Sequence, residues 1–467
     1  MMESRKDEKK TYQLTRSIPV EEGYDIVVAG GGPAGSAAAI CAARLGARVL
    51  LAEATGCLGG MGTSGMVAAF GPMANGERSL VGGFPRELME KMYSRGFLPP
   101  DVKPKNWRKD YHHWVRFNPE GLKLLLDELA TDAGVEVRFY TKVIDAEADR
   151  ENRKVEGVIL HNVEGYSYVP ARAFVDATGD AVLADLCGAH CREAGRDAPN
   201  LMPSTMCSAQ SSIDFSNLGN QQEAVLKAIE DGFFSQPDRH VPGLFRSGRT
   251  TASLNAGHVF EMNALSCGSL SEGMIRGRKL VWEYVDFYRK YVAGCQNMEF
   301  VTTAALMGVR DSRRIVGEYK LNITDDFLAR RQFPDQIGVL NRFADVHVHD
   351  SSEEEYERFS HRLKEMRLGV GECFGIPYGV IVPRGWSNLW APGRCASSDD
   401  LVHGSIRAQP PSSMMGQAAG TAAVQSIRTG QPACDLDTEE LVISLRNAEA
   451  YLPQETLSTT MTRSAKQ

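Results

Sequence analysis

The chain has 467 residues, of which 43% are hydrophobic and 24% are charged, and its formal net charge is -7. This composition is typical of a soluble globular protein, and it excludes a mostly disordered chain, a collagen-like rod and a coiled coil. The acidic balance argues against a nucleic-acid partner, because no excess of cations exists to neutralise phosphates.

The predicted location is the cytoplasm. Ten cysteines occur without a CxxC pair or zinc-ligand spacing, which indicates reduced thiols. The first ten residues are charged and no apolar segment follows them, so we expect no secretory signal. Eighteen uninterrupted apolar residues occur nowhere, and we expect no membrane partner. The number of copies in an assembly is left open.

A βαβ unit is predicted at the start of the fold, after a polar tail. Residues 24–29 form a buried strand, residues 36–45 a helix of small residues, and residues 47–52 a second strand. The motif Gly30-x-Gly32-x-x-Gly35 lies between the first strand and the helix, and Glu53 closes the second strand. This placement predicts a dinucleotide site, whereas the three glycines alone would be weak evidence.

Each residue of this motif has a physical task. The first glycine permits a tight turn, the second lets the backbone approach a pyrophosphate, and the third lets the helix pack on the strand. The free N–H groups at the helix start favour a phosphate. Glu53 would accept hydrogen bonds from ribose hydroxyls.

The rest of the chain alternates strands, helices and glycine-rich loops. Helices are expected over residues 85–93, 119–132, 271–292 and 413–427. Strands are expected over residues 135–140, 143–148, 155–160, 166–169, 173–177, 376–383 and 389–392. The strands between residues 143 and 169 form a β-meander. The fold class is therefore α/β, with a Rossmann-type domain of parallel sheet plus β-meander and an inserted α+β substrate domain.

Glycines spread over the whole length favour an extended ligand that distant segments touch. They recur at Gly59-Gly60-Met61-Gly62, in Asp176-Ala177-Thr178-Gly179-Asp180, at Gly393, and in Gly416-Gln417-Ala418-Ala419-Gly420. FAD is such a ligand. The sequence has no second strand–GxGxxG–helix unit, so a dedicated NAD(P)H domain is not expected.

On these motifs, together with Arg310-Asp311-Ser312-Arg313-Arg314-Ile315 and Ile376-Pro377-Tyr378, the chain resembles the FAD-dependent oxidoreductases of the glutathione-reductase-like superfamily. Within it, the chain is similar to a bacterial group sometimes labelled xanthan lyase. The resemblance covers residues 23 to about 450 and is specific in the FAD-binding part. It implies a flavoenzyme that oxidises or reduces a small organic substrate at the flavin N5.

The resemblance also implies which residues contact FAD. Pyrophosphate, ribose, adenine, ribitol and flavin contacts are expected from Gly30, Gly32, Pro33, Ala34, Gly35, Glu53, Ala54, Gly59, Gly60, Met61, Thr63, Ser64, Val143, Thr178, Gly179, Asp180, Gly393, Arg394, Ser413 and Met414. Many relatives have Gly-Asp where this chain has Gly393-Arg394, which leaves open whether Asp399 or Asp400 replaces the acidic ribitol contact.

The expected domain limits follow from these assignments. They are a polar tail over residues 1–22, FAD-binding segments over residues 23–74, 116–199 and 371–467, a cap segment over residues 75–115, and a substrate domain over residues 200–370.

The candidate catalytic residues are His403, Arg407 and Arg314. His403 and Arg407 precede the helix expected to face the flavin, where a histidine could move a proton and an arginine could bind a carboxylate. Arg314 belongs to a cluster with Arg310 and Arg313, whose members either bind an anionic substrate or pair with acids on the surface.

Three other features allow a functional and a structural interpretation. His347 and His349 lie on one face of an extended segment and could bind a metal with Asp345 or Asp350, but no third ligand is identifiable, and we expect no metal. His112 and His113 could cap the site or lie in an exposed loop. Cys57 is either a packed thiol or a group near the flavin.

A second class of function is an electron-transfer subunit of a larger redox complex. Such subunits need iron–sulfur cysteine runs, and this sequence has none. A third class is a lyase or a non-enzymatic protein, which a colourless preparation would favour.

Overall fold

The computed structural model describes residues 11–197 and 201–453. Its centre is a parallel sheet of five strands in the order β20-β9-β1-β2-β5. The strands span Leu389–Trp390 (β20), Ala173–Asp176 (β9), Ile26–Ala29 (β1), Val49–Ala52 (β2) and Glu136–Arg138 (β5). The predicted α/β class with a Rossmann-type sheet is confirmed.

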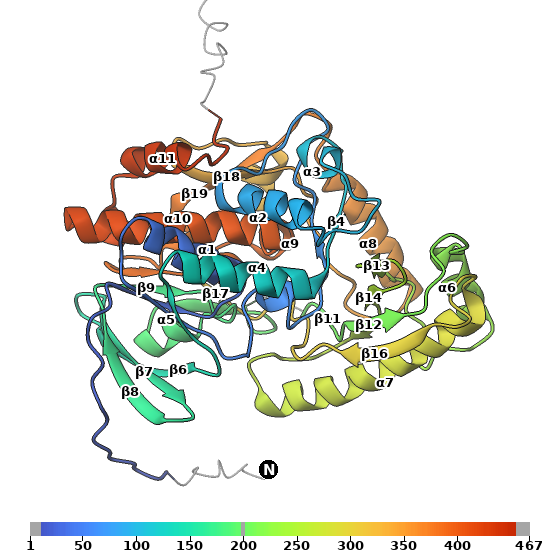
Figure 1. Ribbon diagram of the computed structural model, residues 1–467, viewed down its shortest axis with the longest axis horizontal. Coiled ribbons are helices and arrows are strands. Elements are labelled where there is room, and N and C mark those ends of the chain that lie inside the picture. Colours follow the sequence, from blue (N-terminus) through green and yellow to red (C-terminus); the bar gives the residue numbers. More distant parts are fainter. Residues whose placement is uncertain (1–10, 198–200, 454–467) are drawn as a thin grey trace, which may run out of the picture.

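Both faces of the sheet are covered. Successive side chains of a strand point to opposite faces, and each face packs into its own hydrophobic core. Ile26 and Val28 pack into a core shared with the helices, whereas Val27 and Ala29 pack into a core shared with the β-meander. The helices of the first face are α1 (Pro33–Arg44), α2 (Gly83–Ser94), α4 (Pro119–Asp132) and α10 (Gln409–Thr429). Figure 1 shows them stacked along the upper half of the molecule.

The β-meander, as expected, consists of three antiparallel strands, β6 (Lys142–Asp149), β7 (Lys154–Asn162) and β8 (Gly165–Pro170). Helix α5 (Val182–Cys187) and β10 (Cys191–Glu193) follow, and β10 pairs with the distant β17 (Arg313–Ile315). Segments far apart in the sequence therefore build this half together.

Helices α1 and α10 approach each other at small residues. A Cβ on Gly416 would lie 2.0 Å from the carbonyl oxygen of Ala34, and one on Gly420 would lie 2.3 Å from that of Ala38. Only glycine allows this distance between two helix backbones. The contact fixes the start of α10 next to the start of α1.

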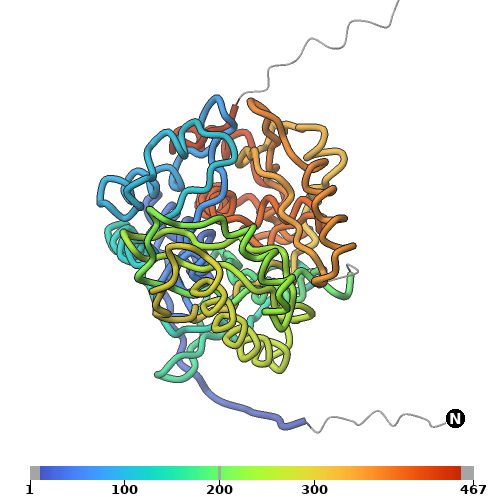
Figure 2. Tube along the Cα trace, turned by 90° about the vertical axis from the view of Figure 1, so that its right-hand side faces the viewer, coloured from blue at the N-terminus to red at the C-terminus, as the bar shows by residue number. Residues whose placement is uncertain are grey.

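A second hydrophobic core lies within residues 206–307, a shorter range than the expected 200–370. The long helix α7 (Cys267–Tyr291) packs on the antiparallel sheet β13-β14-β12-β16, beside α6 (Gln221–Glu230). The strands span Gly243–Arg246 (β13), Ala252–Asn255 (β14), Ser208–Ser211 (β12) and Glu299–Thr303 (β16). In Figure 2 this green-to-yellow stretch forms one part of the molecule, and the blue and red segments meet in another.

The remaining elements join the two parts or cover their edges. The strands are β3 (Ala69–Phe70), β4 (Val115–Arg116), β11 (Ser204–Thr205), β15 (His258–Val259), β18 (Gln336–Leu340) and β19 (Phe374–Pro377). The helices are α3 (Lys105–Arg108), α8 (Glu353–Glu365), α9 (Asp400–Ile406) and α11 (Thr438–Asn447). Among the described residues, no helix combines the length and apolar character needed to cross a bilayer.

Candidate functional site

A cavity of about 680 Å³ runs from the first glycine motif to the second core. One end is lined by the βαβ unit and the start of the β-meander, including Gly32, Glu53 and Val143. The other end is lined by residues of the second core and by the segment after β18, including Phe245 and Arg342. The cavity therefore joins the predicted cofactor site to the inserted part of the chain.

The three motif glycines differ in what a side chain would meet. A Cβ on Gly30 would lie 2.6 Å from the carbonyl oxygen of Ala177, and one on Gly35 would lie 1.8 Å from that of Gly30. A Cβ on Gly32 meets nothing within 4 Å, because it would extend into the cavity. Gly30 and Gly35 are thus required by packing, and Gly32 keeps open the space in which a pyrophosphate fits.

Glu53 lies buried at the same end of the cavity. Its Oε2 accepts a hydrogen bond from the Gly31 backbone N–H at 2.6 Å, and its Oε1 accepts from the backbone and the hydroxyl of Thr55, both at 2.7 Å. The carboxylate ties the glycine loop to the end of β2. Its remaining lone pairs suit a ribose hydroxyl.

Arg394 lines the cavity and is held there by neighbouring polar groups. Its Nη1 lies 2.8 Å from Asp180 Oδ1 and donates to Ser312 Oγ at 2.7 Å. A Cβ on Gly179 would approach Arg394 Nη2 to 2.8 Å, so the guanidinium lies directly over that glycine. We call Gly30 to Gly35, Glu53, Gly179, Asp180 and Arg394 the nucleotide cradle.

The two acids left open as substitutes are engaged elsewhere. Asp399 caps α9 by accepting from the Val402 N–H at 2.7 Å, and Asp400 pairs with Arg314. Neither lines the cavity.

The start of α10 reaches the cavity through Ala408, Gln409 and Ser412. The helix begins four residues earlier than predicted, and Ser413 and Met414 do not line the cavity. Ser413 donates to the carbonyl of Pro33 at 3.2 Å, which links α10 to α1. A helix N-terminus at this place would stabilise negative charge.

Residues 59–64 divide between the cavity and the core. Gly60 and Met61 line the cavity, but Thr63 and Ser64 are turned away from it. Thr63 Oγ1 donates to the carbonyl of Leu58 at 2.6 Å, and Ser64 Oγ lies 3.1 Å from Cys57 Sγ. Gly59 has a φ of 96° and starts this turn, without lining the cavity. The other expected cofactor residues that line it are Pro33, Ala34, Ala54, Thr178 and Gly393.

Three arginines from separate segments face the far end of the cavity, and we call Arg310, Arg342 and Arg407 the guanidinium wall. Burial, followed by the charge of Arg407, lowers the pKa of Arg310 to about 10, and burial lowers that of Arg342 to about 10. Asp345 is their nearby acid: its Oδ2 lies 2.9 Å from Arg342 Nη2 and 3.3 Å from Arg407 Nη2.

Several donors of this wall remain unsatisfied. Within the described residues, Nε and Nη1 of Arg342 and Nε of Arg407 have no hydrogen-bond partner. The guanidinium carbon of Arg342 also lies 4.7 Å from the centre of the Trp114 ring, and both side chains line the cavity. Two acids act on the wall from further away, Asp238 on Arg310 and Asp311 on Arg407. Among the described residues only Asp345 pairs directly with this wall, and an anion in the cavity could pair with it as well.

The other two candidate catalytic residues lie outside the cavity. His403 is fully buried, and its Nε2 lies 3.2 Å from the carbonyl oxygen of Arg310. Burial, and then Arg314 and Arg407, lower the pKa of His403 well below its usual value. Arg314 pairs with Asp400 on the neighbouring helix, as the structural interpretation of the arginine cluster expects.

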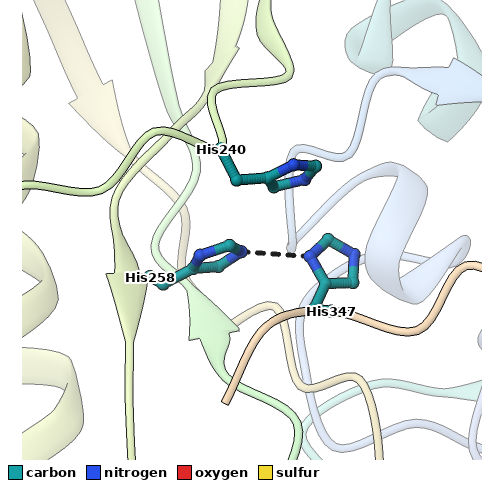
Figure 3. Close-up of side chains that lie close together, drawn as sticks. All are labelled: His240, His258 and His347. Atoms are coloured by element: carbon teal, nitrogen blue, oxygen red, sulfur yellow. Dashed lines mark hydrogen bonds between the residues drawn. The ribbon is translucent and has the colours of Figure 1, made fainter. Parts of the chain in front are cut away.

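A cluster of three histidines borders the guanidinium wall, and we call His240, His258 and His347 the histidine cluster (Figure 3). One ligand atom of each lies within 4.8 Å of the others. His349, the expected partner of His347, is not a member, because its Nδ1 lies 3.4 Å from the carbonyl oxygen of Leu201. Burial lowers the pKa of His240 to about 4 and also lowers those of His258 and His347.

Sequence reasoning missed His240, His258 and Arg342. They lie up to 102 residues apart and share no motif, and only the packing of the second core against the segment after β18 joins them. His112 and His113 do not line the cavity, although the adjacent Trp114 does. The missed residues had no local signal beyond being histidines and an arginine.

Comparison with known proteins agrees with the cradle. A family model described as FAD dependent oxidoreductase matches residues 25–445. Among solved structures, a geranylgeranyl bacteriochlorophyll reductase-like protein from Thermoplasma acidophilum is 14% identical, with 92% of this chain and 85% of that chain covered and a TM-score of 0.45. The myxobacterial chondrochloren halogenase is 15% identical, with 92% and 79% covered and a TM-score of 0.45.

The p-nitrophenol 4-monooxygenase from Pseudomonas putida is 11% identical, with 92% and 88% covered and a TM-score of 0.45. No assignment rests on these three structural likenesses. None of the curated proteins searched matches the chain. The family match covers most of the sequence, and the open space at Gly32, the buried carboxylate of Glu53 and the helix start at Ala408 fit the group that this family binds. The chain is therefore an enzyme of the FAD dependent oxidoreductase family, and its cofactor is FAD.

Proposed function

We propose that this enzyme oxidises or reduces a small anionic organic substrate, a hydroxy or oxo carboxylate, at the end of the cavity beside the guanidinium wall. The observation that carries the proposal is the largely buried positive charge of Arg310, Arg342 and Arg407, which all line this end of the cavity. A carboxylate matches the planar donor fork of a guanidinium.

The cofactor contacts belong to the same proposal. The nucleotide cradle would hold the pyrophosphate and the adenosine ribose, with Val143 beside the adenine and Arg394 neutralising phosphate charge. Bound FAD supplies hydride exchange at N5 of its ring. The start of α10 would stabilise negative charge on the ring. We also place the chain in the glutathione-reductase-like superfamily on the strength of the βαβ unit and the β-meander.

The protein's own residues bind and orient the substrate and exclude water. The guanidinium wall would hold the carboxylate, and the apolar side chains of Phe245, Leu306 and Met307 would cover the reacting carbon. Exclusion of water strengthens each charged contact inside the cavity. Residues 206–307 would act as the substrate domain.

The test is an anaerobic titration of the yellow holoenzyme with matched pairs of hydroxy acids and their methyl esters. We expect at least one acid to bleach the flavin absorbance and its neutral ester to fail. Equal bleaching by acid and ester, or bleaching only by neutral alcohols or amines, would contradict an anionic substrate.

A further inference from the structure

We infer that the histidine cluster is a site for one divalent transition-metal ion, which opens onto the cavity and takes an oxygen of the substrate as a further ligand. The ion site stands on the geometry of this chain alone. Only the identity of that oxygen rests on the proposed function.

The first argument is convergence. His240 follows α6 in a loop, His258 lies in β15, and His347 lies in the segment after β18. Figure 3 shows His258 and His347 pointing at each other, with the ring of His240 stacked above that of His258 at a centroid distance of 5.2 Å. His258 Nε2 lies 3.0 Å from His347 Nδ1. Two imidazole nitrogens on one tetrahedral zinc ion are separated by about 3.3 Å, since each Zn–N bond is about 2.0–2.1 Å.

The second argument concerns the nitrogens that point away from the centre. His258 Nδ1 lies 2.8 Å from Asp238 Oδ2, and His347 Nε2 lies 3.4 Å from Asp345 Oδ1. A carboxylate beside the outer nitrogen favours the ring proton there, so the inner nitrogen keeps its lone pair. With one ring proton between the two inner nitrogens, the 3.0 Å contact is a hydrogen bond. With both protons on the outer nitrogens, two lone pairs face each other, and a cation between them would resolve the repulsion.

The third ligand and the open position lie toward the cavity. His240 and His347 line the cavity, whereas His258 lies behind them. Asp238 Oδ1 accepts from the His240 backbone N–H at 2.9 Å, so one carboxylate orients the segments of two ligands. Ion binding needs the His240 nitrogen to move toward the other two, because the 4.8 Å range of the three ligand atoms exceeds the about 3.3 Å that separates two nitrogens on one zinc ion. Three protein ligands with an open fourth position are the arrangement of a catalytic rather than a structural metal site.

The three imidazole ligands indicate the kind of ion, and the charge of the nearby arginines indicates its further ligand. Imidazole ligands suit Zn²⁺, Co²⁺, Ni²⁺, Cu²⁺ and Fe²⁺ rather than Mg²⁺ or Ca²⁺. The guanidinium wall lies on the same cavity and disfavours an additional cation. An anionic oxygen ligand offsets this charge, and an anionic hydroxy or oxo acid could reach the ion and the arginines together.

The experiment titrates metal-free, untagged holoenzyme with Co²⁺ and records the spectrum against the same enzyme loaded with Zn²⁺, which cancels the flavin bands. We expect about one Co²⁺ per chain, with d–d bands of nitrogen and oxygen coordination and no thiolate charge-transfer band. His258→Gln and His347→Gln should weaken Co²⁺ binding more than about 100-fold, and Asp238→Asn about 10- to 100-fold. His349→Gln is the matched control and should bind Co²⁺ as the wild type does.

The outcomes separate this inference from the proposed function because FAD content is measured in the same samples. A wild-type holoenzyme that keeps its FAD but binds no Co²⁺, or shows thiolate bands, overturns the metal site and leaves the proposed function intact; the two rings then share a proton. Unchanged binding in folded His258→Gln overturns it as well. Bound Co²⁺ with no acid that bleaches the flavin would overturn the proposed function alone. If a variant fails to fold, the wild-type spectrum still decides.

Discussion

The nucleotide cradle and the guanidinium wall lie in one cavity but are built in opposite ways. The cradle is organised around the backbone of a single turn, Gly30 to Gly35, to which Glu53, Gly179, Asp180 and Arg394 are added. The wall consists of side chains from residues 310, 342 and 407, which only tertiary packing brings together. A cofactor site that depends on a short motif can therefore be predicted from the sequence. A substrate site whose residues are far apart in the chain cannot.

The largest expected effect breaks the cradle. Gly32→Val should abolish FAD binding, because its side chain would enter the space left for the pyrophosphate. The measurement is flavin content per chain after purification. Gly268→Val is the control, since Gly268 is exposed and a Cβ there also meets nothing within 4 Å. Normal flavin content in a folded Gly32→Val variant would refute the cradle.

The second effect acts on the wall and should spare the cradle. Arg407→Met should keep the flavin content and slow substrate-dependent bleaching by about 30- to 1000-fold, which corresponds to roughly 2–4 kcal/mol for a lost charged contact in the transition state. Stopped-flow absorbance under anaerobic conditions measures the rate. Arg314→Met is the matched control, because Arg314 pairs with Asp400 outside the cavity. Equal rates in Arg407→Met and wild type would remove the wall from the chemistry.

The helices and strands were easier to predict from the sequence than the guanidinium wall. The helix over residues 119–132 and the β-meander were predicted almost to the residue, because Pro119 and the polar turns mark their limits. Chain order selects His403, but the structure places its ring on the buried side of α9, against the carbonyl oxygen of Arg310. Chain order locates a backbone segment, but it does not say which side of a helix a ring occupies.

A third, smaller effect is expected at Arg394, a cationic residue of the cradle. Arg394 lies between Asp180 and the cavity, where its charge would meet the pyrophosphate. Arg394→Met should weaken FAD binding about 10- to 100-fold, because a hydrogen bond to a charged group contributes roughly 1.5–3 kcal/mol. Titration of the apoenzyme with FAD, followed by fluorescence quenching, measures the dissociation constant. An Arg394→Lys variant should recover part of the loss, since the charge returns without the planar fork. Unchanged affinity in Arg394→Met would mean that the guanidinium serves only Asp180 and Ser312.

The smallest effect is expected at Ser64, which the resemblance assigns to the flavin side and the structure turns toward Cys57. Ser64→Ala removes a hydroxyl that does not line the cavity, so flavin content and bleaching rate should stay within about threefold of the wild type, the range of a change below about 0.7 kcal/mol. Cys57→Ala should behave alike. We also expect noncovalent FAD, so acid precipitation should release yellow FAD from the wild type and from both variants. The informative contrast is with Met61, three residues earlier, which does line the cavity. Met61→Ala should slow bleaching more than Ser64→Ala does, because it removes packing beside the cofactor. If Ser64→Ala instead slows bleaching tenfold or more, the turn over residues 59–64 must present its hydroxyls to the ring when FAD is bound, and the cradle then extends further toward the wall than its backbone contacts indicate.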